Sequence, residues 1–172
     1  MSEERAKLIT FKGNSMTLVG EPVHEGQKAP NFKVVDNGLN PVTLQSSAGK
    51  IRLITVVPSL DTPVCDSMTR HFNQHAANLP DNVVIYTISL DLPFAQARWC
   101  GNAGIEKVQT LSDYQERSFG LGYGLLIKEL KLLARAVVVI DADDHIRYLE
   151  IVPEVTAEPD YDAALAAVKS LV

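Results

Sequence analysis

The chain has 172 residues and a mass of 18.8 kDa, enough for one ordinary domain that buries roughly 70% of the surface its unfolded form exposes. Its net charge is -5 and its lysines and arginines are scattered, which excludes the basic surface typical of a nucleic-acid-binding protein. No apolar run is long enough to span a membrane, and the charged start, MSEERAKLITF, lacks the features of a secretory signal. We therefore expect a single domain over residues 1–172, located in the cytoplasm and binding neither nucleic acid nor membranes.

The first fifty residues predict short extended segments. The stretch KLITFKGNSMTLVG alternates between apolar and polar residues and turns at Lys12-Gly13-Asn14, a pattern that indicates an N-terminal β-hairpin. FKVVD and PVTL predict two further short strands. We expect these segments to flank the core.

From residue 51 onward, strands and helices alternate. The order strand, helix, strand, helix, strand predicts parallel strands joined by right-handed crossovers, over residues 51–57, 65–79, 82–90, 93–104 and 107–113. A helical or loop stretch near residues 117–123 precedes a hairpin made of ARAVVVID and HIRYLEIV, and PDYDAALAAVKSLV closes the chain as an amphipathic helix. The fold class predicted is α/β, a thioredoxin-like sandwich with a central mixed β-sheet, flanking helices and an N-terminal β-hairpin.

Cys65 is predicted to lie in the first turn of a helix. Thr62 offers an oxygen that can accept a free helix amide hydrogen, and Pro63 is favourable at the first helical position. The free amides and the positive end of the helix dipole favour a thiolate there. Cys65, Met68 and Phe72 share one apolar face, so the thiol points inward. Inert packing is the alternative interpretation, because free cysteine is among the most buried residue types.

Ionisation of the Cys65 thiol alone would not account for the rate enhancement of an enzyme. A free thiol is a few per cent ionised at neutral pH, so full ionisation increases the reaction rate about 30-fold, whereas enzymes accelerate reactions about a millionfold or more.

Arg135 interrupts the apolar segment ARAVVVID, and a buried guanidinium is costly unless an anion pairs with it. Two interpretations stay open: a structural ion pair or an exposed strand end, and a group that holds the Cys65 thiolate and orients an incoming oxygen.

Cys100, in ARWCGNAG, is the second cysteine. It is predicted near a helix end, with Gly101 as a stop signal, in a region that opens at little cost. The two cysteines are not a local CxxC pair, and a disulfide requires α-carbons within about 7 Å. We therefore expect the reduced sulfurs to lie too far apart to bond, and the oxidised form to be locally remodelled. If Cys65 is inert, Cys100 is an ordinary helix cysteine.

These segments resemble a known family. PSLDTPVC fits the peroxiredoxin pattern of proline, three residues, threonine, two residues and cysteine, and DLPFAQARWCG and EPDYDAALAAVK are similar to its bacterial thiol peroxidase branch. The resemblance extends over nearly the whole chain. It implies an atypical two-cysteine peroxidase that is a homodimer but forms its disulfide within one chain.

The resemblance also implies roles. Cys65 would be the peroxidatic cysteine, Thr62 and Arg135 would orient the thiolate and the peroxide, Pro58 would shield the pocket, and Cys100 would be the resolving cysteine. The substrates implied are hydrogen peroxide and organic hydroperoxides, and thioredoxin is the implied reductant. No cofactor and no metal are expected.

The sequence also allows other functions. His71 and His75 lie four residues apart and could share a metal, but no third ligand is evident. A cysteine hydrolase would need His24 or His145 to approach Cys65. A non-enzymatic thiol redox sensor on the same fold is the main alternative. An apolar pocket mouth is guessed to include Leu60, Met68, Leu121 and Tyr123.

Overall fold

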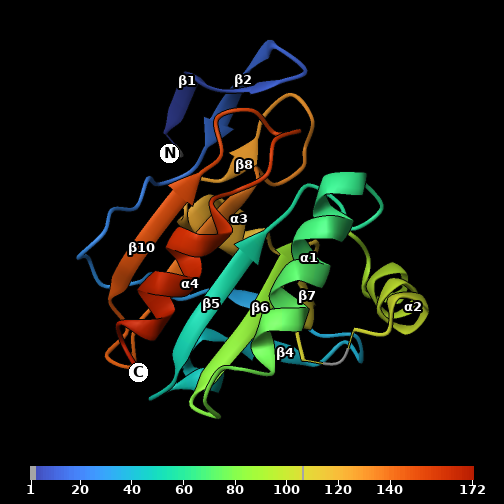
Figure 1. The fold of residues 1–172 in the computed structure, drawn as a ribbon. Helices are drawn as coiled ribbons and strands as arrows, with labels where there is room; N and C mark the ends of the chain where they lie inside the picture. Colours follow the sequence, from blue (N-terminus) through green and yellow to red (C-terminus); the bar gives the residue numbers. More distant parts are fainter. Residues whose placement is uncertain (1–2, 106) are drawn as a thin grey trace.

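The computed structural model describes residues 3–105 and 107–172. Its main sheet has seven strands in the order β10-β9-β5-β6-β7-β3-β4 (Figure 1). The three inner strands β5, β6 and β7 are parallel, and the other four are added antiparallel, which gives the expected mixed sheet. The bounds are β3 (Lys33–Val35), β4 (Pro41–Thr43), β5 (Ile51–Val56), β6 (Val83–Ser89), β7 (Gln109–Ser112), β9 (Ala136–Ile140) and β10 (Ile146–Ile151).

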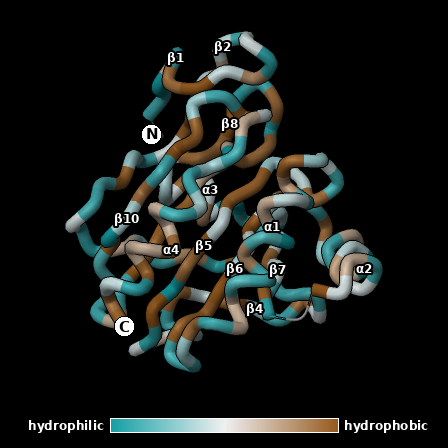
Figure 2. The backbone as a smooth tube through the Cα atoms, viewed as in Figure 1, coloured by the Kyte–Doolittle hydropathy of each residue, from teal (hydrophilic) through white to brown (hydrophobic). Residues whose placement is uncertain are grey.

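Helices cover both faces of this sheet. The helix α1 (Pro63–Ala76) connects β5 to β6, and α2 (Pro93–Ala103) connects β6 to β7, as the alternating pattern predicts. The two other α-helices are α3 (Ser118–Gly122) and α4 (Tyr161–Lys169), and the short 3-10 helix η1 (Leu44–Ser47) follows β4. All six residues of β5 are buried, and Figure 2 shows apolar residues concentrated along the inner strands.

Two apolar clusters lie on opposite faces, because neighbouring residues of a strand point to opposite sides. One face carries Leu53 and Val137 and packs against α1 and α4. The other carries Ile54 and Val138 and packs against Phe119 of α3. Cys65 belongs to the first cluster, so the sheet supports the predicted site from beneath α1.

The N-terminal hairpin forms a second sheet. Its strands β1 (Glu4–Phe11) and β2 (Asn14–Val19) are antiparallel, and the turn uses Lys12 and Gly13, both at positive φ. The predicted hairpin is thereby confirmed. A third strand that the sequence does not indicate, β8 (Leu126–Ile127), pairs with β2. Over the residues the structure describes, no helix combines the length and the apolar character needed to cross a membrane.

Candidate active site

Cys65 lies where the helix pattern predicts it. The helix α1 begins at Pro63, so Cys65 is in its first turn, and its side chain is 0% exposed. Met68 and Phe72 are also fully buried on the same helix face. The inward-pointing apolar face of α1 is therefore confirmed.

Thr62 occupies the N-cap position, but its side chain does not cap the helix. Its backbone is extended, with φ -93° and ψ 147°, as an N-cap requires. The hydroxyl instead donates to the Ser59 carbonyl oxygen at 2.9 Å, so the expected bond from a helix amide to Thr62 is wrong. Because the hydroxyl hydrogen is used by the loop before the helix, the oxygen keeps its lone pairs for a group in the adjoining pocket.

That pocket has a volume of about 400 Å³ and brings together three predicted site residues. Pro58 and Thr62, from the loop before α1, line it together with Arg135, which is distant in sequence. The remaining lining residues are Phe11, Lys12, Pro63, Val64, Val155 and Thr156. Cys65 is not itself among the lining residues, but it follows Val64 directly and is fully buried. None of the four residues expected at the mouth is among the lining residues. Leu60, Met68 and Tyr123 are buried in the core, and Leu121 packs against the apolar cluster on the other face of the sheet.

Arg135 lies on the α1 side of the sheet, immediately before β9. It is 2% exposed, its Nε donates to the Val155 carbonyl oxygen at 2.7 Å, and its Nη1 is 3.7 Å from the Met68 sulfur. Among the residues described, no carboxylate lies within 4 Å of its guanidinium. The structural ion pair and the exposed strand end are therefore both wrong. The positive charge faces the pocket beside the Cys65 turn.

Two carboxylates that the sequence analysis missed hold this pocket in shape. Asp91, just after β6, accepts hydrogen bonds from Ser59 Oγ and the Leu60 amide, both at 2.8 Å, and so fixes the loop that carries Pro58. Its position after a parallel strand was a usable signal, because site residues gather at the carboxyl ends of such strands.

Glu154 is the other. It accepts from the Gly13 amide at 2.8 Å and the Thr10 hydroxyl at 2.9 Å, which ties the hairpin to the loop containing Val155. Hydrogen bonds, first of all from Thr156, lower the pKa of Glu154 to about 2. No local pattern indicated these contacts, since the partners are far apart in sequence.

Cys100 lies outside the pocket. It is half-buried on α2 and lines a separate hollow of about 530 Å³, and its sulfur is 3.4 Å from the Thr110 hydroxyl oxygen. Both cysteines are free thiols. The helix does not stop at Gly101: it continues to Ala103 and ends at Gly104, whose φ of 68° is the left-handed conformation that glycine adopts most readily.

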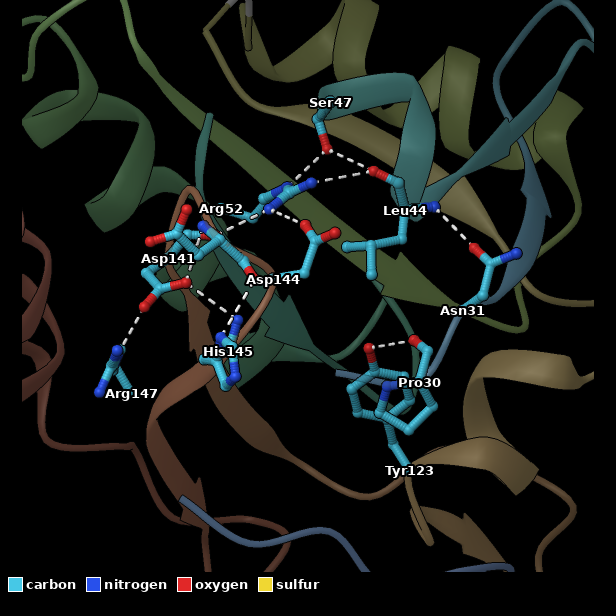
Figure 3. Close-up of polar contacts among 11 residues, drawn as sticks. Pro30, Asn31, Leu44, Ser47, Arg52, Tyr123, Asp141, Asp144, His145 and Arg147 are labelled. Atoms are coloured by element: carbon cyan, nitrogen blue, oxygen red, sulfur yellow. Dashed lines mark hydrogen bonds and ion pairs between the residues drawn. The ribbon is translucent and has the colours of Figure 1, made fainter. Parts of the chain in front are cut away.

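The histidines do not form a hydrolase site with Cys65. His145 lies at the far end of β9 from Arg135, in the network of Arg52, Asp141 and Asp144 (Figure 3). His24 lies at that same end, since the Gly26 amide bonds to the Ile146 carbonyl oxygen.

His71 and His75 likewise form no metal site with a third ligand. The ring of His71 stacks on Tyr161 with centroids 4.0 Å apart, and burial lowers the pKa of His71. Within residues 3–105 and 107–172, no group of three or more His, Cys, Asp or Glu is placed to hold a metal ion.

The chain is similar to known proteins over nearly its whole length. Residues 24–165 match the family described as Redoxin. The chain is 59% identical over 162 residues to a protein named thiol peroxidase from Halalkalibacterium halodurans, covering 94% of this chain and 97% of that protein. The thiol peroxidase of Bacillus subtilis strain 168 is 53% identical, with 95% and 98% covered.

A solved structure is also similar to this chain over nearly its full length. The peroxiredoxin-like protein from Aquifex aeolicus has a TM-score of 0.91 at 38% identity, with 99% of both chains covered. The likeness confirms the α/β, thioredoxin-like fold class that the alternating strands and helices predict.

Proposed function

Because the chain belongs to the redoxin family, and within it to the thiol peroxidases, we propose that it reduces hydroperoxides with Cys65 as the attacking group. The single observation that carries the residue assignment is the pocket beside Cys65. It joins Pro58 and Thr62, before the start of α1, to Arg135, whose guanidinium has no carboxylate partner among the residues that the structure describes. A buried cation without an anion is suited to a site where negative charge appears.

In the first step, the Cys65 sulfur attacks one oxygen of the peroxide. The sulfur–oxygen bond forms as the oxygen–oxygen bond breaks, so that a thiol and ROOH give Cys65 sulfenic acid and ROH, which is water when the substrate is hydrogen peroxide. The first-turn amides of α1 and the Arg135 guanidinium are donors that can stabilise negative charge on the reacting atoms. Arg135 and Thr62 orient the peroxide oxygens, and Pro58 excludes water.

In the second step, the Cys100 thiol condenses with the sulfenic acid. The products are a disulfide between Cys65 and Cys100 within one chain and one molecule of water. Cys100 lines a different hollow from the peroxide pocket, so α2 must rearrange before the sulfurs meet. Forming this disulfide protects Cys65 from a second peroxide.

The remaining partners follow from this cycle. A dithiol reductant must return two electrons to the disulfide, and thioredoxin is the reductant we propose. Hydrogen peroxide and organic hydroperoxides are the substrates, the cycle uses no metal or other cofactor, and we place the enzyme in the cytoplasm as a homodimer.

A coupled assay tests this function. Reduced protein is mixed with thioredoxin, its reductase, NADPH and a hydroperoxide, and NADPH oxidation is followed over many equivalents. We expect sustained turnover by the native chain, none by Cys65→Ser, and loss of thioredoxin-dependent recycling in Cys100→Ser. Consumption of a single equivalent by the native chain would favour a redox sensor and contradict the proposed enzyme.

A further inference from the structure

Beside the two cysteines, a group of polar contacts centred on Trp99 joins α1 and α2. The indole Nε1 donates to Asp66 Oδ1 at 3.0 Å, while Arg70 Nε donates to Asp66 Oδ2 at 2.8 Å. The Arg70 guanidinium also lies over the Trp99 ring, 5.8 Å from its centroid, and its Nη1 donates to the Ala103 carbonyl oxygen at 3.2 Å. Both oxygens of Asp66 thus accept hydrogen bonds, and these contacts join α1 to the carboxyl-terminal part of α2.

These residues are the immediate neighbours of the cysteines. Asp66 follows Cys65, and Trp99 precedes Cys100. Cys65 and Cys100 pack against the same apolar cluster, yet successive residues of a helix point about 100° apart. The side chains that join the two helices are therefore not those that must form the disulfide.

We propose that Trp99, held by Asp66 and Arg70, is a latch that keeps Cys100 away from Cys65 and sets the rate of disulfide formation. This inference rests on the proposed function. A disulfide requires the two α-carbons within about 7 Å, whereas the two helices are now joined through the hydrogen bond from the Trp99 indole to the Asp66 carboxylate. In this proposal, Cys100 reaches Cys65 only after the Trp99 indole has separated from α1. That separation breaks the hydrogen bond to Asp66 and the contact with Arg70.

The latch decides between two fates of the Cys65 sulfenic acid. In one, Cys100 condenses with it to the disulfide and releases water. In the other, a second hydroperoxide transfers one oxygen to the same sulfur, which gives sulfinic acid and releases the alcohol or water. Only the first fate requires α2 to move. A tighter latch therefore favours sulfinic acid, and a weaker latch favours the disulfide.

Trp99→Phe tests the latch, because it keeps an aromatic ring over which Arg70 can lie but removes the N–H donor. Reduced protein is mixed with hydroperoxide, quenched in acid at set times, and its free thiols, disulfide and sulfinic acid are counted by mass spectrometry. We expect disulfide formation to be about fivefold faster, as the loss of one hydrogen bond predicts. The peroxide concentration that converts half of Cys65 to sulfinic acid should rise by about the same factor.

Arg70→Gln is the second variant, and it also weakens the latch because the ion pair and the cation–π contact are lost. It keeps Trp99, the only tryptophan in the chain, so the indole fluorescence reports the opening directly. Arg70→Lys should restore part of the native rate. The matched control is Arg98→Gln, an exposed change on α2, the helix that carries Trp99. The Arg98 side chain has no hydrogen bond or ion pair with the residues described, and native rates are expected.

The outcomes separate the latch from the proposed function. Sulfenic acid formation is measured first by trapping in the Cys100→Ser background. If none is trapped, the peroxidase function fails. If sulfenic acid forms normally but disulfide formation is unchanged or slower in both Trp99→Phe and Arg70→Gln, the latch is overturned.

Discussion

At the scale of single residues, Arg135 shows how a local anomaly in the sequence becomes a site. A guanidinium at the start of an apolar strand was visible from the sequence, but its partners were not. Met68 precedes Arg135 by 67 residues and Val155 follows it by 20. Sequence alone therefore indicated the charge, and only the fold showed that no carboxylate in the described part of the chain pairs with it.

Replacing Arg135 with methionine should slow the first chemical step. Methionine keeps much of the side-chain volume but removes the cation, and the loss of one preorganised charged donor typically lowers a rate about 100-fold or more. The second-order rate constant of Cys65 oxidation, measured by stopped flow at several hydroperoxide concentrations, is the quantity to compare.

The control for that change is Arg147→Met. Arg147 is 49% exposed in its side chain and pairs with Asp141 at the opposite end of β9, so its loss should leave the oxidation rate unchanged. Arg135→Lys keeps a charge and should retain part of the activity. Equal rates for Arg135→Met and the native chain would exclude Arg135 from the chemistry.

At the scale of elements, α1 and α4 begin with the same backbone conformation but use their first side chains differently. Thr62 and Asp160 are both extended N-cap residues. Asp160 caps α4 by accepting from the Ala163 amide at 3.0 Å, whereas the Thr62 hydroxyl bonds the preceding loop. Asp160 thus stabilises its helix, whereas Thr62 contributes an oxygen to the pocket.

Thr62→Val should therefore lower activity more than stability. Valine has nearly the shape of threonine, and no helix-capping bond is lost, so the free energy of unfolding should fall by about 1 kcal/mol, the value of the single hydrogen bond to the Ser59 carbonyl. The oxidation rate should fall at least tenfold because the peroxide loses an orienting group. Urea unfolding and stopped-flow oxidation of the same sample measure both. A large stability loss with native activity would contradict the assignment.

Asp160→Ala should have the opposite result. Removing a helix N-cap typically costs about 1 kcal/mol of stability, and α4 lies away from the pocket lining. We expect a lower urea midpoint and an unchanged oxidation rate. Asp162→Ala, an exposed change in the same helical turn without the capping bond, should cost less, and a loss equal to that of Asp160→Ala would show that the cap contributes nothing.

The elements themselves were predictable where periodicity is local. The helices α1, α2 and α4 and the hairpin of β9 and β10 appear at the predicted segments, because apolar spacing and turn residues lie within each. The two-residue strand β8 was not predictable, since its pairing with β2 depends on the tertiary fold. The end of α2 was placed wrongly because Gly101 and Gly104 both resemble stop signals.

At the scale of the whole molecule, the pocket depends on contacts between distant segments. Glu154 joins the hairpin turn at Gly13 to the loop whose Val155 carbonyl holds Arg135. The predicted residues Pro58, Thr62 and Arg135 meet because β5 and β9 are neighbours in the sheet. The residue types at the site could be predicted from the sequence, but the segments that line the pocket could not.

The pH dependence of stability is a property of the whole molecule to which Asp113 contributes. Its side chain is 1% exposed and accepts from the amides of Phe119 and Gly120 in α3. Burial raises the pKa of Asp113 from 3.8 to about 6 despite these bonds. The folded state therefore binds this proton more tightly than the unfolded state does.

The sign of the effect follows from that difference. The stabilisation by the Asp113 proton is fully present below about pH 4 and is lost as the pH rises to about 6, and a shift of two pKa units corresponds to about 3 kcal/mol. Asp113→Asn cannot ionise, so the free energy of unfolding of the native chain should fall relative to this variant between pH 4 and 6. Urea unfolding of both proteins across that range measures the difference, and Asp143→Asn, at an exposed carboxylate, is the control. A constant difference between native and Asp113→Asn proteins would mean that Asp113 is already ionised at pH 4, with its two amide bonds outweighing the cost of burial.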